Sequence, residues 1–338
     1  MNRRIVILLS AIVVLIALLV IGLIQTKTQQ QYFRNEGLVF GTYYNIRYEG
    51  TQDLESQILS RLRDVDTTLS MFNPQSVVSR INRNEDLTIN HDLLTVYVQA
   101  GEVYILSHGA FDITVAPLVN AWGFGFTDRT AGPTQPQIDS LLTFIGMDGL
   151  SLSGRQLHKA DPRMMLDASA IAKGYACDVA AQVLRDAGCR NYLVDIGGEV
   201  VAQGVNDRGE AWRVGITKPE DDTTNTKQNL QAVIKAQSLC MATSGNYRRF
   251  YYEGGERRSH TIDPRNGYPV NHNLLSATVV STTCTRADAL ATACMVMGAE
   301  DGKAMIETLD STACYFIIAD GDSLRVETST NWEQIIGL

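Results

Sequence analysis

An unbroken apolar run near the N-terminus constrains this chain most. Ile5 to Ile24 are 20 residues without a charge, and Arg3 and Arg4 precede them. At about 1.5 Å of rise per residue, a helix of this length matches the roughly 30 Å hydrocarbon core of a bilayer. Arginines before the run favour a cytoplasmic N-terminus. The run therefore predicts a membrane span, with the rest of the chain outside the cytoplasm.

A cleaved signal peptide is the alternative for the same segment. The run is long for a signal peptide, and Gln25-Thr26-Lys27-Thr28 contains no small-x-small cleavage site. The first cysteine is Cys177, so no nearby cysteine is available for lipid attachment. We expect residues 1–28 to be a retained anchor and tether, and both alternatives place residues 29–338 outside.

The composition is that of a folded globular protein, with 45% hydrophobic and 20% charged residues. A net charge of −8 and a pI near 5.2 argue against a nucleic-acid partner. The six cysteines show no CxxC spacing that would indicate zinc. Cys177 and Cys294 lie among small apolar residues and are expected to be buried packing residues, so no disulfide is predicted.

Hydrophobic spacing separates helices from strands along the chain. Three- and four-residue spacing predicts an amphipathic helix over residues 54–69. Other helices are expected over 93–107, 285–297 and 303–309, and strands over 38–48, 192–196, 199–203, 212–217, 314–318 and 324–327. A polar tether is expected to reach Arg34, and a loop covers 127–137. The pattern predicts an α+β fold with largely antiparallel sheets and packed helices. No GxGxxG follows a strand, which argues against a Rossmann site.

Asp167-Ala168-Ser169-Ala170-Ile171-Ala172-Lys173 is the first candidate site segment. A helix beginning near Ser169 would place Lys173 in its early turns, where amides and the ammonium form an anion site. The alternative is a tightly packed helix with a solvated lysine and Asp167 as a capping acid.

The second candidate segment contains His260, which precedes the turn sequence Asp263-Pro264-Arg265-Asn266-Gly267. Proline, asparagine and glycine favour a rigid turn, and histidine is suited to accept a proton near neutral pH. A structural histidine is the alternative.

Asp288 and Thr292 form the third candidate segment, because a spacing of four residues places them on one helix face. A carboxylate and a hydroxyl together suit a hard cation such as Mg²⁺. Thr285-x-x-Asp288 also fits a capping box, which would leave Thr292 unexplained.

Taken together and in order, these segments resemble the FAD:protein FMN transferases (the ApbE family). The resemblance runs from about Gly41 to Gly298 and includes the motifs Phe111-Asp112-Ile113-Thr114, Trp122-Gly123-Phe124-Gly125, Asp167 to Tyr175, Asp195-Ile196-Gly197-Gly198, Thr243-Ser244-Gly245, His260 to Pro269 and Ala287-Asp288 to Thr292.

The resemblance implies an enzyme that splits FAD and attaches FMN to a threonine or serine hydroxyl of an acceptor protein, releasing AMP. It implies Mg²⁺ held by the carbonyl of Ala170 and by Asp288 and Thr292, with His260 as the base. The implied contacts to FAD are Phe40, Phe72, Ala110, Phe111, Asp112, Asp167, Lys173 and Ile262.

Residues 29–338 would then form the catalytic region, held outside the bacterial cytoplasmic membrane by a single anchor. The implied acceptor is a subunit of a membrane redox complex that carries a flavinylation motif. This chain lacks the motif Asp-x-x-(Ser/Thr)-Gly-(Ala/Ser)-(Ser/Thr), so self-modification is not expected. An FAD pyrophosphatase and a non-catalytic FAD-binding protein are the alternative functions.

Overall fold

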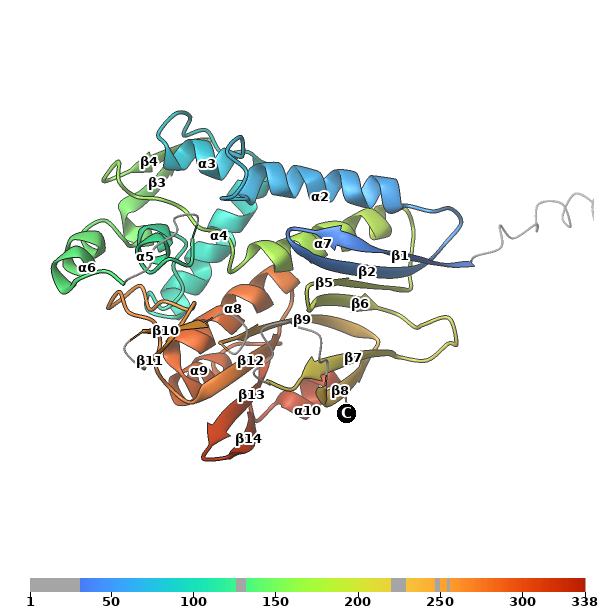
Figure 1. Ribbon diagram of the computed structural model, residues 1–338. Helices are drawn as coiled ribbons and strands as arrows, with labels where there is room; N and C mark the ends of the chain where they lie inside the picture. Colours follow the sequence, from blue (N-terminus) through green and yellow to red (C-terminus); the bar gives the residue numbers. More distant parts are fainter. Residues whose placement is uncertain (1–30, 126–131, 220–228, 247–249, 254–255, 338) are drawn as a thin grey trace, which may run out of the picture.

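The computed structural model describes residues 31–125, 132–219, 229–246, 250–253 and 256–337 (Figure 1). The predicted span Ile5–Ile24 and residues 25–30 of the tether lie outside these ranges. Within them, no helix is long and apolar enough to cross a membrane.

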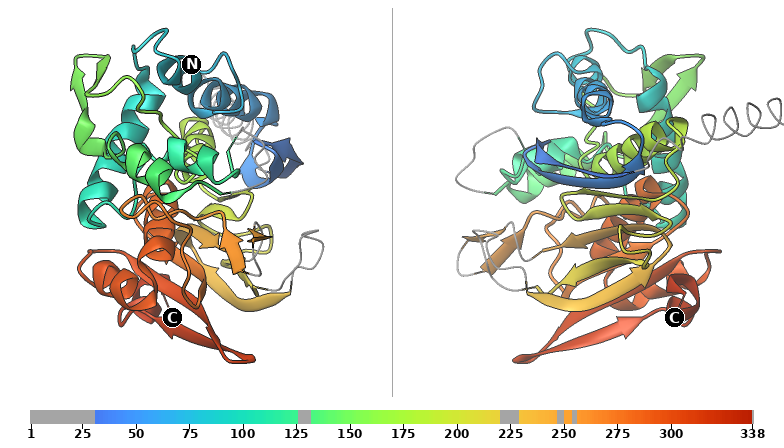
Figure 2. Two further views of the ribbon diagram at one scale, coloured as in Figure 1. Left: turned by 60° about the vertical axis from the view of Figure 1, so that its left-hand side comes forward. Right: turned by 90° about the vertical axis from the view of Figure 1, so that its right-hand side faces the viewer.

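One antiparallel sheet of eight strands organises the described residues, in the order β1-β2-β5-β6-β9-β12-β13-β14 (Figures 1 and 2). Its strands are β1 Gln31–Val39, β2 Thr42–Gly50, β5 Tyr192–Ile196, β6 Glu199–Gln203, β9 Ser238–Gly245, β12 Leu274–Val280, β13 Ala313–Asp320 and β14 Ser323–Thr328. Three antiparallel pairs accompany it: β3 Leu150–Ser153 with β4 Gln156–Lys159, β7 Trp212–Thr217 with β8 Leu230–Ala236, and β10 Phe250–Glu253 with β11 Glu256–Ser259.

Different elements pack on the two faces of the sheet. The first face packs on helices α2 Glu55–Leu69, α4 His91–Leu106, α7 Ala172–Asp186, α8 Cys284–Met297 and α9 Ala299–Glu307. The second face packs on the β7–β8 pair and α10 Trp332–Ile336. Along β2, Tyr44, Ile46 and Tyr48 are buried on the first face, and the residues between them point to the second. The α+β prediction is therefore confirmed.

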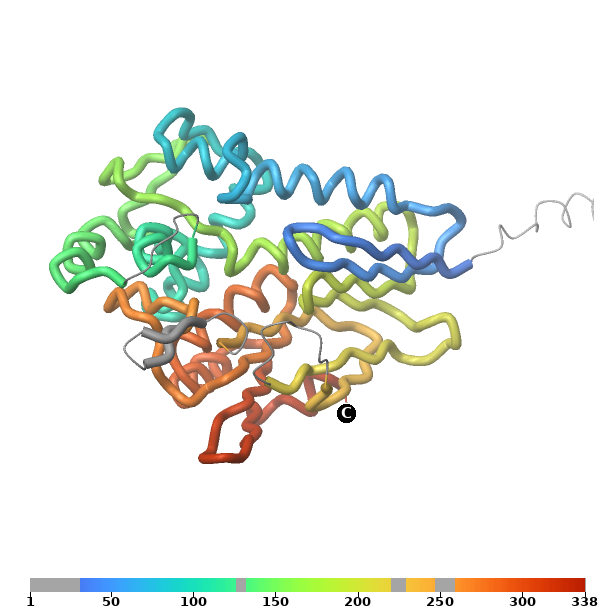
Figure 3. Tube along the Cα trace, viewed as in Figure 1, coloured from blue at the N-terminus to red at the C-terminus, as the bar shows by residue number. Residues whose placement is uncertain are grey.

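A smaller apolar cluster joins segments that are distant in sequence. Leu118 of α5 Ala116–Ala121 and Ile138 of α6 Gln135–Leu142 pack with Trp122 and Ile262. Figure 3 shows these green and orange parts of the chain side by side. The remaining helices are α3 Val77–Asn82 and the 3₁₀ turn Met147–Gly149.

Most predicted elements are present, with three corrections. The strand expected over 38–48 is two strands, β1 and β2, joined by the two-residue turn Phe40–Gly41. Phenylalanine is not a residue that marks such turns, which usually contain Asn, Asp or Gly. The tether does not reach Arg34, since β1 already begins at Gln31, and α6 begins at Gln135 inside the predicted loop. All six cysteines are free.

Candidate active site

A cavity of about 1640 Å³ lies across one end of the sheet. The β1–β2 turn, the β5–β6 turn at Gly197–Gly198 and the end of β9 meet there. Every residue that the sequence assigned to the site lines this cavity: Phe40, Phe72, Ala110, Phe111, Asp112, Asp167, Ala170, Lys173, His260, Ile262, Asp288 and Thr292. The fold thus brings the three candidate segments together, while the role of each residue stays a prediction.

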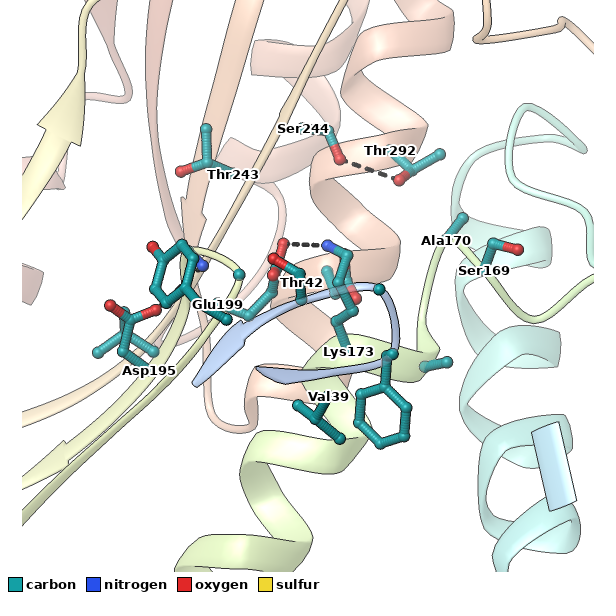
Figure 4. A pocket seen from close by; sticks show the side chains of 18 of the residues that line it. Val39, Thr42, Ser169, Ala170, Lys173, Asp195, Glu199, Thr243, Ser244 and Thr292 are labelled. Carbon is teal, nitrogen blue, oxygen red and sulfur yellow. Dashed lines mark hydrogen bonds and ion pairs between the residues drawn. The ribbon is translucent and has the colours of Figure 1, made fainter. Parts of the chain in front are cut away.

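Lys173 lies in the first turn of α7, which begins at Ala172, three residues later than expected. Its Nζ pairs with Oε1 of Glu199 at 2.5 Å, so the solvated-lysine alternative is wrong (Figure 4). Burial acts to lower the pKa of Lys173, but the charges of Glu199 and Asp288 outweigh it and raise that pKa. The ammonium therefore stays charged at the helix N-terminus, where the helix dipole also favours anions.

Glu199 is a site residue that the sequence analysis missed. It is 1% exposed, and its Oε2 atom has no hydrogen-bond partner among the described residues. Burial raises the pKa of Glu199 above its usual value, and the charge of Lys173 offsets part of this effect. The available signal was a carboxylate that directly follows Gly197-Gly198 and precedes three apolar residues of the same strand.

Asp288 is 2% exposed and lines the cavity from α8. Its Oδ2 accepts a hydrogen bond from the amide of Gly174 on α7 at 2.9 Å. The side chain that caps α8 is Thr283, whose hydroxyl accepts from the amide of Arg286 at 3.1 Å. The capping-box interpretation of Asp288 is therefore wrong, because another residue does the capping.

Thr292 lies one turn beyond Asp288, and its hydroxyl is 3.0 Å from the hydroxyl of Ser244 on β9 (Figure 4). Ala170 lies in the turn before α7 and lines the same cavity. A carboxylate, a hydroxyl and a main-chain carbonyl are the oxygen ligands that Mg²⁺ prefers. The described residues contain no cluster of three His, Cys, Asp or Glu side chains that could hold a metal. Any cation here would therefore need ligands of other kinds, and the Mg²⁺ site stays a prediction.

Two further acids stand on the first-face side of the cavity. Asp112 is 6% exposed, and burial raises its pKa to about 6, although the amide and hydroxyl of Thr114 both donate to it. Asp167 is 8% exposed and accepts from the amide of Ser169 at 2.8 Å. Because this bond closes a local turn before α7, Asp167 does not cap the helix.

His260 precedes a tightly bonded turn. Gly267 has φ +82 and donates its amide to the carbonyl of Asp263 at 2.8 Å. The indole of Trp122 donates to the carbonyl of Gly267 at 2.8 Å. The ring of Phe124 lies edge-on to the ring of His260, with the two ring centroids 6.4 Å apart. The aromatic segment 122–125 therefore supports both the turn and the histidine.

The aromatic residues assigned to the flavin dinucleotide differ in exposure. Phe111 is 2% exposed and belongs to the main core, whereas Phe72 is 65% exposed. Phe40 sits at the β1–β2 turn with φ +53, a conformation that is costly for a residue with a side chain. Phe40 and Phe72 thus offer accessible aromatic surface, whereas little of Phe111 is exposed.

Comparison with known proteins identifies the family. A model described as the ApbE family matches residues 40–316. The chain belongs to the ApbE family. The FAD:protein FMN transferase of Vibrio cholerae is 34% identical over 335 residues, which cover 96% of this chain and 98% of that protein. The Escherichia coli enzyme of the same name is 33% identical, covering 89% of this chain and 88% of that protein.

Solved ApbE structures show the same fold. The flavin transferase ApbE from Vibrio cholerae superposes with a TM-score of 0.80 at 35% identity, covering 90% of this chain and 99% of that one. The apo flavinyl transferase ApbE of Pseudomonas stutzeri gives 0.81 at 30% identity, covering 91% and 98%. These matches extend over most of the described residues.

Proposed function

We propose that this ApbE-family enzyme transfers FMN from FAD to a threonine or serine hydroxyl of an acceptor protein and releases AMP. The observation that carries this proposal is the convergence of Lys173, the Asp288/Thr292 pair and His260 on one cavity. The names of the ApbE relatives supply the substrate class.

Lys173 is placed to bind the pyrophosphate of FAD. Its ammonium is held by Glu199 at the N-terminus of α7, so an anion there meets the ammonium and the positive end of the helix dipole. As the phosphoryl group is transferred, negative charge moves to the departing AMP phosphate, and a fixed positive charge stabilises that change. Aromatic surface at Phe40 and Phe72 is available to a flat ring.

A divalent cation is part of the proposal. Acidic side chains outnumber basic ones among the described residues that line the cavity. Because Glu199 offsets part of the charge of Lys173, the ammonium alone leaves much of the pyrophosphate charge unbalanced, and an added cation would balance it. Ala170, Asp288 and Thr292 would hold the ion, which when bound supplies charge neutralisation at the phosphate oxygens.

His260 acts as the base in this proposal. The acceptor hydroxyl oxygen forms a bond to the phosphorus of the FMN half, and the bond from that phosphorus to the AMP phosphate oxygen breaks. The hydroxyl proton passes to the imidazole of His260, a transfer suited to histidine near neutral pH. The turn at Asp263–Gly267 and its bond from Trp122 hold the ring in place.

The test is mass spectrometry of a purified acceptor domain incubated with the full chain, FAD and Mg²⁺. We expect covalent FMN on the acceptor with the wild type and with the control His158→Ala, an exposed histidine on β4. His260→Ala, Asp288→Asn and chelation by EDTA should each reduce the rate by roughly 100-fold or more.

The same assay separates the alternatives. Release of free FMN and AMP at the same rate without an acceptor would establish an FAD pyrophosphatase instead. Bound FAD that stays intact would establish a binding protein. Unchanged transfer by both His260→Ala and Asp288→Asn would refute the assigned roles.

The proposal also places the cavity outside the cytoplasm, with residues 1–28 as the membrane anchor and a membrane redox-complex subunit as the acceptor. Its support is the 20-residue uncharged run and the arginines before it.

A further inference from the structure

The cavity extends beyond the residues assigned to FAD. It passes around the strand ends to the second face of the sheet, where its walls come from β2, β5 and β7. We call this part the second-face compartment; it is lined by Tyr43, Asn45, Arg47, Leu193, Asp195 and Trp212. In Figure 4, Asp195 lies on the other side of Glu199 from Lys173.

Strand alternation explains why the compartment exists. Tyr44 and Ile46 of β2 point into the main core, so Asn45 and Arg47 point to the second face. On that face the β7–β8 pair packs over β6 and β9, as the membership of the second core shows. Asn45, Arg47 and Asp195 of β5 are not part of that core and line open space instead, while Leu193 of β5 and Trp212 of β7 lie where the core borders the compartment.

The size of the cavity leaves room for a second occupant. Its volume of about 1640 Å³ exceeds the roughly 300–1,000 Å³ typical of small-molecule sites. The residues assigned to FAD contact lie at the β1–β2 turn or on the first-face side, and none belongs to the second-face compartment. A reaction between FAD and a protein hydroxyl requires both substrates in one continuous space.

Two buried polar atoms of the compartment have no partner among the described residues. These are Nε of Arg47, a donor, and Oδ1 of Asn45, an acceptor. Buried polar atoms in folded proteins are nearly always paired, so these two show that contacts within the chain leave hydrogen-bonding capacity of both side chains unused beside the cavity. Arg47 also has no ion-pair partner in the part of the chain that the structure describes.

We propose that the second-face compartment binds the segment of the acceptor protein that carries the reacting hydroxyl. An extended peptide offers N–H groups to Asn45 and C=O groups to Arg47, and an acidic side chain in that segment would pair with the guanidinium. The segment then leads into the space that Lys173 and His260 line. This inference rests on the proposed function, because it assigns a place to the second substrate of that reaction.

The test compares Arg47→Gln with the wild type, using an acceptor domain that contains an Asp-x-x-Thr-Gly-Ala-Thr segment. Affinity for this domain is measured by calorimetry on His260→Ala backgrounds with FAD bound, so the result does not depend on turnover. We expect Arg47→Gln to weaken acceptor binding roughly tenfold or more while the FAD dissociation constant stays within about twofold, since the lost bond is a charged one to the peptide.

Two controls accompany the test. Arg34→Gln removes an exposed arginine of β1 that pairs with Glu36 and does not line the cavity, so it should leave acceptor affinity unchanged.

Replacing the acidic residue of the acceptor by Asn should weaken binding to the wild type and have no further effect on Arg47→Gln, as expected for two groups that contact each other. The melting temperature of each variant checks its folding, and Asn45→Asp gives an independent second change in the compartment.

A fall in FAD affinity with unchanged acceptor affinity would assign the compartment to FAD and overturn the inference. Equal acceptor affinity in the wild type, Arg47→Gln and Asn45→Asp would overturn it as well. Failure of the wild type to flavinylate the acceptor would refute the proposed function alone, because acceptor binding is measured separately.

Discussion

At the scale of single residues, Phe40 adopts a strained backbone conformation at the edge of the site. It stands in a two-residue turn with φ +53, next to Gly41 with φ +72. A left-handed conformation costs a residue with a side chain about 1–2 kcal/mol. The surrounding hairpin holds it there, and the aromatic ring is thereby presented to the cavity. Strain of this kind is concentrated at functional sites.

Asp112 makes the stability of the protein depend on pH. Burial raises its pKa from 3.8 to about 6 in the folded state. The folded protein therefore keeps this proton over a pH range in which the unfolded chain loses it, and the contribution of Asp112 to stability falls as the pH rises through that range. Relative to Asp112→Asn, the free energy of unfolding of the wild type should fall by on the order of 3 kcal/mol between about pH 3.5 and about pH 7.

Urea unfolding of the wild type and Asp112→Asn at several pH values checks this prediction, because the other titrating groups cancel in the difference. A difference that stays constant across the range would show that Asp112 titrates normally.

At the scale of elements, the close approach of α7 and α8 assembles the site. A Cβ atom at Gly174 would lie 2.2 Å from the carbonyl oxygen of Cys284 and 2.7 Å from the Cβ of Asp288. Asp178 of α7 accepts from the amides of Cys284 and Thr285, at 3.0 and 2.8 Å, where α8 begins. One helix thus supplies Lys173 and also positions the start of the helix that carries Asp288.

Gly174→Ala should therefore separate the two helices. We expect a loss of about 1–3 kcal/mol in the free energy of unfolding, as for overpacking in a core, together with weaker binding of FAD and of the divalent cation. Denaturant unfolding and FAD titration with and without Mg²⁺ measure both effects.

Gly101→Ala in α4 is the matched control. The nearest atom to its added Cβ is the methyl carbon of Met147 at 3.9 Å, an ordinary contact. The free energy of unfolding of this variant should rise by about 0.5–1 kcal/mol, the usual benefit of alanine over glycine within a helix. If Gly174→Ala and Gly101→Ala had the same effect on unfolding and on FAD binding, the close approach of α7 and α8 would not explain why position 174 is glycine.

At the scale of the whole molecule, the sheet separates two cores, and the cavity opens where its strands end. β1 is an edge strand of this sheet, and it begins at Gln31, directly after the segment predicted to leave the membrane. The anchor would thus enter the fold at the edge of the sheet.

We expect the full chain to remain in the membrane fraction after washing with high salt or alkaline carbonate. Protease added outside intact spheroplasts should digest the catalytic region, because the predicted orientation places that region on the outer side of the membrane. Replacing Leu15 and Leu19 by Arg should disrupt the span, because each charge at a helix centre costs about 2.5–3.5 kcal/mol. A soluble wild-type chain, or a catalytic region protected from protease in intact spheroplasts, would contradict this topology.

Local patterns were enough to predict much of the secondary structure. The spacing of Leu54, Ile58 and Leu62 predicts α2, and Gly197-Gly198 between apolar runs predicts the β5–β6 hairpin, because both depend on neighbours in sequence. The turn at Phe40–Gly41 was not predicted, because its left-handed phenylalanine is held by pairing along the whole hairpin. The resemblance to a family supplied the candidate site residues, most of which look structural when taken singly.

The sequence by itself determined the apolar run, the periodic helices and strands, and the order of motifs that identifies the ApbE family. Tertiary structure decided that Asp288 bonds to Gly174 and does not cap its own helix, and that Lys173 is paired with Glu199. It also decided that Asn45 and Arg47 face open space on the second side of the sheet. The reason is that hydropathy and turn signals act over a few residues, whereas burial and pairing depend on which distant segments pack together.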